Sequence, residues 1–211
     1  MKICAVIFDM DGVLIDARDW HYEALNEALG IFGAEIPYSE HLEKFDGLPT
    51  KTKLLTLAGE GRIPKNLMHT IEAVKQERTL RAAAKLCFPR IEHIVMLAEL
   101  RRRGLGLAVA TNSIRSTTQT MLAYAGVLEF MDHVVTNEDV KSPKPNPDVY
   151  LLACSNLGVP PESVLVVEDN VNGVRAAKLA GCNVLEVSEP SNLDLDLIEK
   201  RLQELGSDRD E

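Results

Sequence analysis

Two acidic residues, Asp9 and Asp11, stand one residue apart at the end of an apolar run and directly before Gly12. The run from Ile3 to Phe8 is typical of a buried strand, which does not need two acids at its end. Because Asp and Gly are also common turn residues, an ordinary polar turn is the alternative interpretation. Carboxylates in this position can attack an electrophile or transfer a proton, which makes the pair the first candidate site.

Polar residues also follow three other apolar runs, at 105–110, 133–136 and 163–167. These polar clusters are Thr111 with Asn112 and Ser113, Lys141 with Lys144, and Glu168 with Asp169. Each has a plainer interpretation when taken alone: a helix cap, solvated surface lysines, and acids at a helix amino terminus. In an open parallel sheet, however, the carboxyl ends of the strands share one edge, where ligands bind. We therefore expect these clusters to meet Asp9 and Asp11 there.

Side chains of these types at one edge would suit the binding and transfer of a phosphoryl group. Four carboxylates packed together repel one another unless a cation offsets them, and hard oxygen ligands without His or Cys suit Mg²⁺. Thr111 and the amides after it can donate to phosphate oxygens, and Lys144 adds a positive charge. One carboxylate can attack phosphorus, while a second protonates the leaving oxygen and later deprotonates water.

The chain changes character twice. Residues 17–86 show helical periodicity, as in Trp20, Ala24 and Ala28, and contain no convincing strand. From residue 87 onwards, apolar runs alternate with helical patterns, which predicts a mostly parallel sheet covered on both faces. We therefore expect a core made of 1–16 and 87–211, interrupted by a separate helical domain at 17–86.

Composition excludes several classes of protein. The chain has 211 residues, a net charge of −9 and a pI of about 5.1, which argues against nucleic-acid and anionic-membrane surfaces. No apolar run approaches the ~18 residues of a membrane span, and the opening run is too short for a signal peptide, so we expect a cytoplasmic protein. None of the four cysteines forms a CxxC pair, which predicts reduced structural thiols. Among them, Cys4 and Cys182 lie in apolar runs and are expected to be buried.

The motifs together resemble the haloacid dehalogenase superfamily and, within it, the phosphatases related to β-phosphoglucomutase. The matching segments are FDMDGVLID (8–16), ATNS (110–113), KSPKPNPDVY (141–150) and VVEDNVNG (166–173). The resemblance implies an α/β fold, with a Rossmann-like parallel-sheet core and an inserted all-helical cap domain. It covers nearly the whole chain.

The resemblance also implies roles for single residues. Asp9 would be the nucleophile that becomes an aspartyl phosphate and would also bind the metal. Asp11 would be the general acid and base, with its main-chain carbonyl on Mg²⁺, and Lys144 would neutralise charge on the nucleophile and the phosphate.

Four more residues complete the implied site. Thr111 and Asn112 would hold the transferring phosphoryl group. Asp169, with Glu168, would hold Mg²⁺. Most of the stabilisation of such a transition state is electrostatic and positional.

The second acid, Asp11, narrows the range of reactions that the site would catalyse. Family members that dehalogenate or cleave phosphonates lack an acid two residues after the nucleophile, so Asp11 favours a phosphate ester. Lys51 and Lys53 are similar in position to the Schiff-base lysine of phosphonatases, but Asp11 argues against that activity. Both lysines remain candidates for reading the substrate.

The cap region departs from the mutase pattern. Gly47 matches the glycine of the specificity loop, but Thr50 stands where the mutase has an arginine. His21 aligns with a hinge histidine that couples cap closure to catalysis, although a packing or surface histidine fits the sequence as well. Lys75 or Arg78 would have to replace the mutase's second cap lysine. These differences weaken a mutase more than a phosphatase.

The sequence therefore predicts a monomeric Mg²⁺-dependent phosphatase of a small phosphorylated metabolite, with sugar phosphates among the candidates. The rival function is a hexose-phosphate mutase. Less favoured are a phosphonatase and a non-catalytic protein that binds a phosphorylated metabolite.

Overall fold

The computed structural model describes residues 2–207 and contains one five-stranded parallel sheet in the order β3-β2-β1-β4-β5. Its strands are β1 (Ala5–Phe8), β2 (Gly106–Ala110), β3 (His133–Val135), β4 (Val164–Glu168) and β5 (Asn183–Glu186). The central strand β1 pairs with β2 on one side and β4 on the other, and Phe8 lies opposite both Val109 and Val167. The strands that carry Asp9, Thr111 and Glu168 are therefore neighbours.

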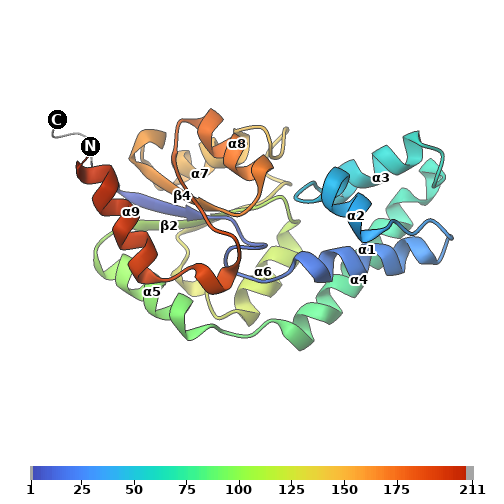
Figure 1. The fold of residues 1–211 in the computed structure, drawn as a ribbon, viewed down its shortest axis with the longest axis horizontal. Coiled ribbons are helices and arrows are strands. Elements are labelled where there is room, and N and C mark those ends of the chain that lie inside the picture. Colours follow the sequence, from blue (N-terminus) through green and yellow to red (C-terminus); the bar gives the residue numbers. More distant parts are fainter. Residues whose placement is uncertain (1, 208–211) are drawn as a thin grey trace. The chain divides into compact units, whose positions relative to one another are not determined.

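Helices cover both faces of this sheet, so the predicted α/β fold is confirmed (Figure 1). The longer helices of this part are α5 (Ile91–Arg102), α6 (Arg115–Tyr124), α7 (Asp148–Leu157), α8 (Val171–Ala180) and α9 (Leu195–Ser207). Three single 3₁₀ turns connect them, η3 (Leu128–Phe130), η4 (Pro161–Ser163) and η5 (Pro190–Asn192). Helices α7 and α8 lie on one face, and α5, α6 and α9 lie on the other.

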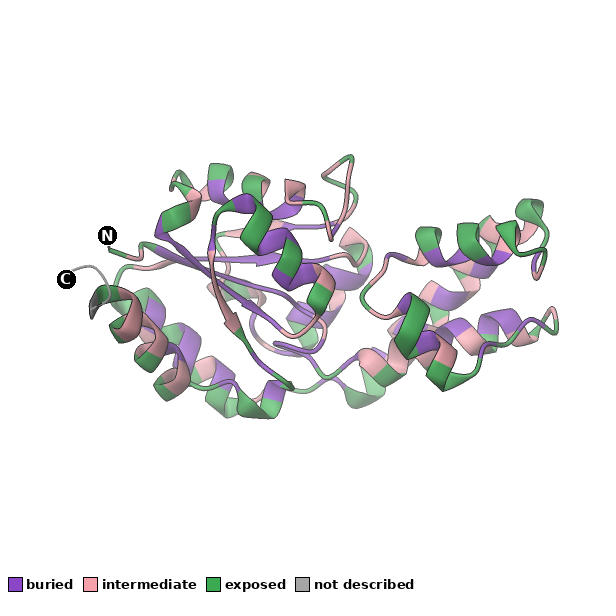
Figure 2. Cartoon of the chain, turned by 45° about the horizontal axis from the view of Figure 1, so that its top comes forward, coloured by how far each residue is buried: buried purple, intermediate pink, exposed green. Residues whose placement is uncertain are grey.

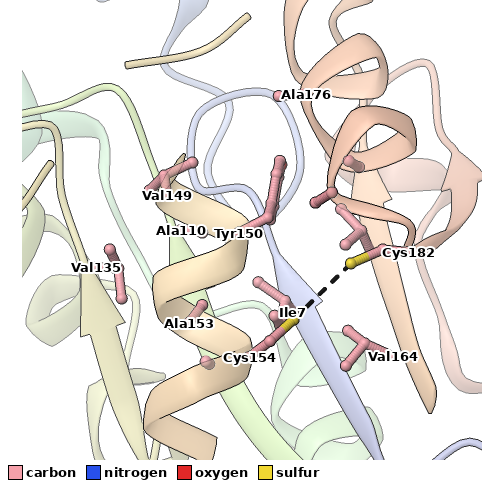
Figure 3. Close-up of a cluster of buried hydrophobic side chains, with 14 of the residues drawn as sticks. Ile7, Ala110, Val135, Val149, Tyr150, Ala153, Cys154, Val164, Ala176 and Cys182 are labelled. Atoms are coloured by element: carbon pink, nitrogen blue, oxygen red, sulfur yellow. Dashed lines mark hydrogen bonds between the residues drawn. The ribbon is translucent and has the colours of Figure 1, made fainter. Parts of the chain in front are cut away.

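The central strands are buried from both sides, as Figure 2 shows. Continuous apolar sequence such as AVIF in β1 is what a two-sided parallel sheet requires. Under α7 and α8 the core includes Ile7, Val164 and Tyr150 (Figure 3). Because aliphatic and aromatic side chains fill this layer, the edge above it is held on a rigid base.

The cysteines differ from the prediction at one position. All four are free thiols, and Cys182 is buried as expected, but Cys4 is exposed. Strand β1 begins only at Ala5, and the Cys4 thiol donates a 3.4 Å hydrogen bond to the carbonyl of Lys2. The apolar run therefore begins before the sheet does. Inside the core, Cys154 and Cys182 lie with their sulfur atoms 3.9 Å apart (Figure 3).

The second part of the chain is helical. It contains α1 (Arg18–Gly30), α2 (Tyr38–Glu40), the π-helix η1 (His41–Phe45), α3 (Thr50–Gly59), the 3₁₀ turn η2 (Lys65–Leu67) and α4 (Met68–Leu86). It has a core of its own, in which Leu25, Phe45, Leu54 and Ile71 are buried. Helices α1 and α4, the first and last of this part, pack on each other.

The chain divides into two compact units, Ala17–Cys87 and the remainder. Cys87 belongs to the helical unit because its N–H donates a 2.9 Å hydrogen bond to the carbonyl of Ala83 and so caps α4. In the part of the chain that the structure describes, no helix is long and apolar enough to cross a membrane.

Candidate active site

The polar edge of the sheet begins where β1, β2 and β4 end. Asp9 follows β1 directly, and its N–H donates a 2.9 Å hydrogen bond to the carbonyl of Val167 in β4. Thr111 follows β2, and Glu168 is the last residue of β4. Asp9, Thr111 and Glu168 are all buried. Their backbone positions are fixed by strand pairing, which is the reason the sequence pattern could anticipate this edge.

Lys144 joins the two acids. Its Nζ lies 2.9 Å from Oδ1 of Asp9 and 2.6 Å from Oε1 of Glu168. The lysine is only 4% exposed, so it is not a solvated surface residue. Asn112 fixes the loop that carries it: the Asn112 side chain accepts from the Lys144 N–H at 3.0 Å and donates to the Lys144 carbonyl at 3.2 Å.

Burial and charge set the protonation of this pair. Burial raises the pKa of Asp9 well above its usual value, because the neighbouring Lys144 offsets only part of the lost solvation and the other acids add to the rise. Burial alone would lower the pKa of Lys144, but Asp9 and Glu168 outweigh it and raise that pKa. Lys144 therefore remains a cation that is bonded to both carboxylates.

Asp11 is held by Ser113, a member of the polar cluster after β2 to which the sequence assigned no role of its own. The Ser113 hydroxyl donates a 2.8 Å hydrogen bond to Oδ2 of Asp11. The N–H of Ser113 in turn donates to the Thr111 hydroxyl at 3.0 Å. Thus the residues after β2 orient the second acid.

Gly12 allows the loop after Asp11 to pass close to Asp169. Its φ is +86°, and a Cβ at this position would lie 2.0 Å from Oδ2 of Asp169. Any larger residue would collide with the carboxylate. Glycine is therefore required here both by the backbone and by the approach of the acid.

Asp9, Glu168 and Asp169 each offer a carboxylate oxygen, and these oxygens lie within 4.8 Å of one another. A donor set made only of carboxylate oxygens suits a hard cation such as Mg²⁺. The residues therefore fit the metal that the sequence predicts. Glu168 is already well bonded, because its Oε2 accepts from the N–H groups of Asp169 and Asn170, both at 3.1 Å.

The phosphate-binding roles of Thr111 and Asn112 stay predictions. Thr111 is bonded to Ser113, and Asn112 is bonded to Lys144. Both residues therefore lie at the sheet edge, as their positions after β2 require. The Asn112 side chain, however, is engaged with the backbone of Lys144. Its observed role is to shape the loop.

Two further residues around Glu168 were absent from the predicted site. The hydroxyl of Tyr150 on α7 donates a 2.6 Å hydrogen bond to Oε1 of Glu168. Gly173 on α8 lies against the same carboxylate. Both residues belong to the quoted motifs, but nothing in the sequence pattern distinguished them from helix packing residues.

In the helical unit the structure pairs His21 with Lys75, whose Nδ1 and Nζ atoms lie 3.0 Å apart. Lys75 and Lys53 are both buried. His41 is buried as well, and burial followed by the charge of Lys53 lowers its pKa to about 4. Buried lysines such as Lys53 and Lys75 are uncommon unless they bind an anion or pair with another residue.

The other expected specificity residues lie elsewhere in this unit. Gly47 is exposed with a φ of +70°, in the turn before α3. Thr50 is the first residue of α3, directly after the N-cap residue Pro49. Lys51 is exposed. Arg78 forms a 3.2 Å ion pair with Glu27. Their contact with a substrate stays a prediction.

A sheet edge with a buried Asp–Lys pair, a second acid two residues on and a cluster of carboxylates that could hold a metal suits phosphate chemistry. Residues 6–187 match the family model for haloacid dehalogenase-like hydrolases. The chain belongs to this family, and the resemblance seen in the sequence motifs is confirmed.

Several proteins are similar over most of their length. The phosphorylated carbohydrates phosphatase of Thermotoga maritima is 33% identical over 178 residues, covering 84% of this chain and 81% of the relative. The structure of CbbY from Rhodobacter sphaeroides in complex with xylulose-(1,5)bisphosphate is 29% identical, with a TM-score of 0.77 and coverage of 86% and 84%. β-Phosphoglucomutase from Clostridium difficile has a TM-score of 0.83 over 96% and 98% of the chains, but at 19% identity it shows the fold alone.

Proposed function

We propose that this protein is a Mg²⁺-dependent phosphatase that hydrolyses a small phosphorylated carbohydrate through an aspartyl phosphate at Asp9. The observation that carries the proposal is the buried contact between Asp9 and Lys144, with Asp11 held by Ser113 at the same edge. The broader class, a phosphoric monoester hydrolase, is confirmed by family membership and by relatives named phosphatases.

The residues support a two-step reaction. A carboxylate oxygen of Asp9 attacks phosphorus, the bond from phosphorus to the ester oxygen breaks, and Asp11 gives its proton to the leaving oxygen. Water, deprotonated by Asp11, then attacks the aspartyl phosphate, which releases inorganic phosphate and restores Asp9. Lys144 offsets negative charge on Asp9 and on the phosphoryl oxygens throughout.

Asp9 and Asp169 would hold Mg²⁺, with the main-chain carbonyl of Asp11 as the family resemblance implies. Glu168 was expected to join them, but its oxygens already accept bonds from the protein. When bound, the metal supplies positive charge that offsets the carboxylates and the phosphate.

The substrate class is supported from two directions. One relative is named for phosphorylated carbohydrates, and another was crystallised with a pentulose bisphosphate. In the helical unit, Lys53 and Lys75 are two buried lysines whose ammonium groups would suit an anionic or hydroxyl-rich ligand. A monomeric state and a cytoplasmic location stay predictions.

A screen of phosphate monoesters with Mg²⁺, which follows both phosphate release and isomer formation, tests the proposal. We expect phosphate release from one or more sugar phosphates. Asp9→Asn should abolish it, and the exposed Asp196→Asn should leave it unchanged.

The screen also distinguishes the rivals. Conversion of glucose 1-phosphate to glucose 6-phosphate, with a bisphosphate activator and without phosphate release, would establish a mutase instead. Undiminished release by Asp9→Asn would show that Asp9 is not the nucleophile.

A further inference from the structure

Glu168 has a protein donor at each of its lone-pair positions. Its Oε1 accepts from Lys144 Nζ and from the Tyr150 hydroxyl, both at 2.6 Å. Its Oε2 accepts from the N–H groups of Asp169 and Asn170. An ionised carboxylate has about four such positions, so this fully buried group is saturated by the protein itself.

Tyr150 contacts this group in two ways. It is the largest fully buried side chain of the chain's described part, and it projects from α7 into the cluster that also contains Ile7 and Cys154 (Figure 3). Its hydroxyl binds Glu168, while Lys144 Nζ lies 4.8 Å from the centre of its ring. Burial first, and then the charge of Glu168, raises the pKa of Tyr150 well above its usual value, which keeps the hydroxyl a donor.

We propose that Tyr150 is a positioning residue: its hydroxyl fixes Oε1 of Glu168, and Glu168 in turn directs the ammonium group of Lys144 at Asp9. Among the described residues the Tyr150 hydroxyl donates to Glu168 and forms no hydrogen bond with Asp9. The kinetic consequence rests on the proposed function, but the arrangement of side chains does not.

The hydroxyl matters because two carboxylates, Asp9 and Glu168, share one cation, the ammonium group of Lys144. Lys144 is bonded to both Asp9 and Glu168, and its position reflects the charge on each. Without the hydroxyl, Oε1 of the fully buried Glu168 keeps Lys144 as its single donor. The carboxylate then draws the ammonium group towards itself and away from Asp9, because a buried acceptor left short of donors is costly.

Tyr150→Phe tests the role, because it keeps the ring over Lys144 and removes only the hydroxyl. We expect kcat to fall about tenfold while KM changes less than about twofold, since Tyr150 does not bind the substrate. Tyr124→Phe, which removes an exposed hydroxyl from α6, should leave both constants unchanged. A lower melting temperature with an unchanged kcat would show a purely structural role and overturn the proposal.

A second measurement does not depend on catalysis. Urea unfolding of Tyr150→Phe, Lys144→Met and the double variant gives a double-mutant cycle. Loss of the hydroxyl changes the equilibrium constant of unfolding by a certain factor. We expect this factor to differ at least fivefold between the protein with Lys144 and the protein without it. If Lys144→Met does not fold, Glu168→Gln replaces it in the cycle.

The two measurements separate the proposals. A wild-type protein inactive on every ester, but with a coupled cycle, would end the proposed function and leave the role of Tyr150 standing. Additive effects in the cycle would overturn the role of Tyr150 whatever the activity.

Discussion

Gly173 approaches Glu168 so closely that a Cβ added to the glycine would lie 1.7 Å from Oε1 of the carboxylate. The carboxylate cannot yield easily, because the protein bonds both of its oxygens. Replacing glycine by alanine inside a helix normally stabilises it by about 1 kcal/mol. Here we expect Gly173→Ala to destabilise the protein by about 1–3 kcal/mol, as overpacking does. Urea unfolding measures the change.

Gly206→Ala is the matched control, because Gly206 lies in α9 and a Cβ there would meet nothing within 4 Å. It should leave stability unchanged or slightly raised. Equal stability of the two variants would contradict the close approach at Gly173.

Removal of the Ser113 hydroxyl should loosen Asp11. The bond it donates to Oδ2 of Asp11 is 2.8 Å long, and bonds to charged groups contribute about 1.5–3 kcal/mol. We expect kcat/KM of Ser113→Ala on the best substrate of the screen to fall about tenfold or more. Ser116→Ala, at an exposed position on α6, should retain wild-type kinetics, and a similar loss there would point to a general effect on folding.

Magnesium should stabilise the folded protein, because a ligand that binds only the native state adds about 2.7 kcal/mol at 100 times its dissociation constant. Asp169→Asn removes one carboxylate of the candidate metal site and should abolish most of this gain. Thermal unfolding with increasing MgCl₂, at constant ionic strength, measures both effects. No rise in the melting temperature of the wild-type protein would count against the metal site.

His41 should make stability depend on pH. It is 1% exposed, and burial followed by Lys53 lowers its pKa to about 4, compared with about 6.5 in an unfolded chain. Between these values the unfolded state binds more protons, so stability falls as the pH falls from about 6.5 to about 4. The contribution is present in full above 6.5, and its loss amounts to at most about 3 kcal/mol.

Unfolding in urea at several pH values checks this dependence. His41→Gln should flatten the slope below pH 6.5, whereas His69→Gln, at an exposed position of α4, should preserve it. An unchanged slope in His41→Gln would assign the acid sensitivity to other groups.

Sequence reasoning succeeded where strand pairing controls position. Asp9, Thr111 and Glu168 meet because their strands are parallel neighbours, and the apolar runs before them revealed those strands. The bond between Ser113 and Asp11 could not be seen in this way, because the residues are 102 positions apart and no periodicity connects them. In the same way, nothing in the helical pattern of α7 shows that Tyr150 carries a hydroxyl to a carboxylate.

Local sequence signals also did not predict where every helix begins or which of its faces is buried. Proline suits the first turn of a helix, but after Pro64 the structure has the 3₁₀ turn η2 first, and α4 begins at Met68. The buried position of Lys53 is likewise a tertiary effect, since its place in α3 does not show which face packs inward.

The helical unit has its own buried core, and its first and last helices, α1 and α4, pack on each other. Both chain ends of this unit therefore lie in one pair of packed helices. A segment with this construction can be exchanged for another as a single piece while β1 and β2 keep their hydrogen bonds. Under the proposed function, in which Lys53 and Lys75 of this unit meet the substrate, such an exchange would change the substrate while the residues at the sheet edge stay in place.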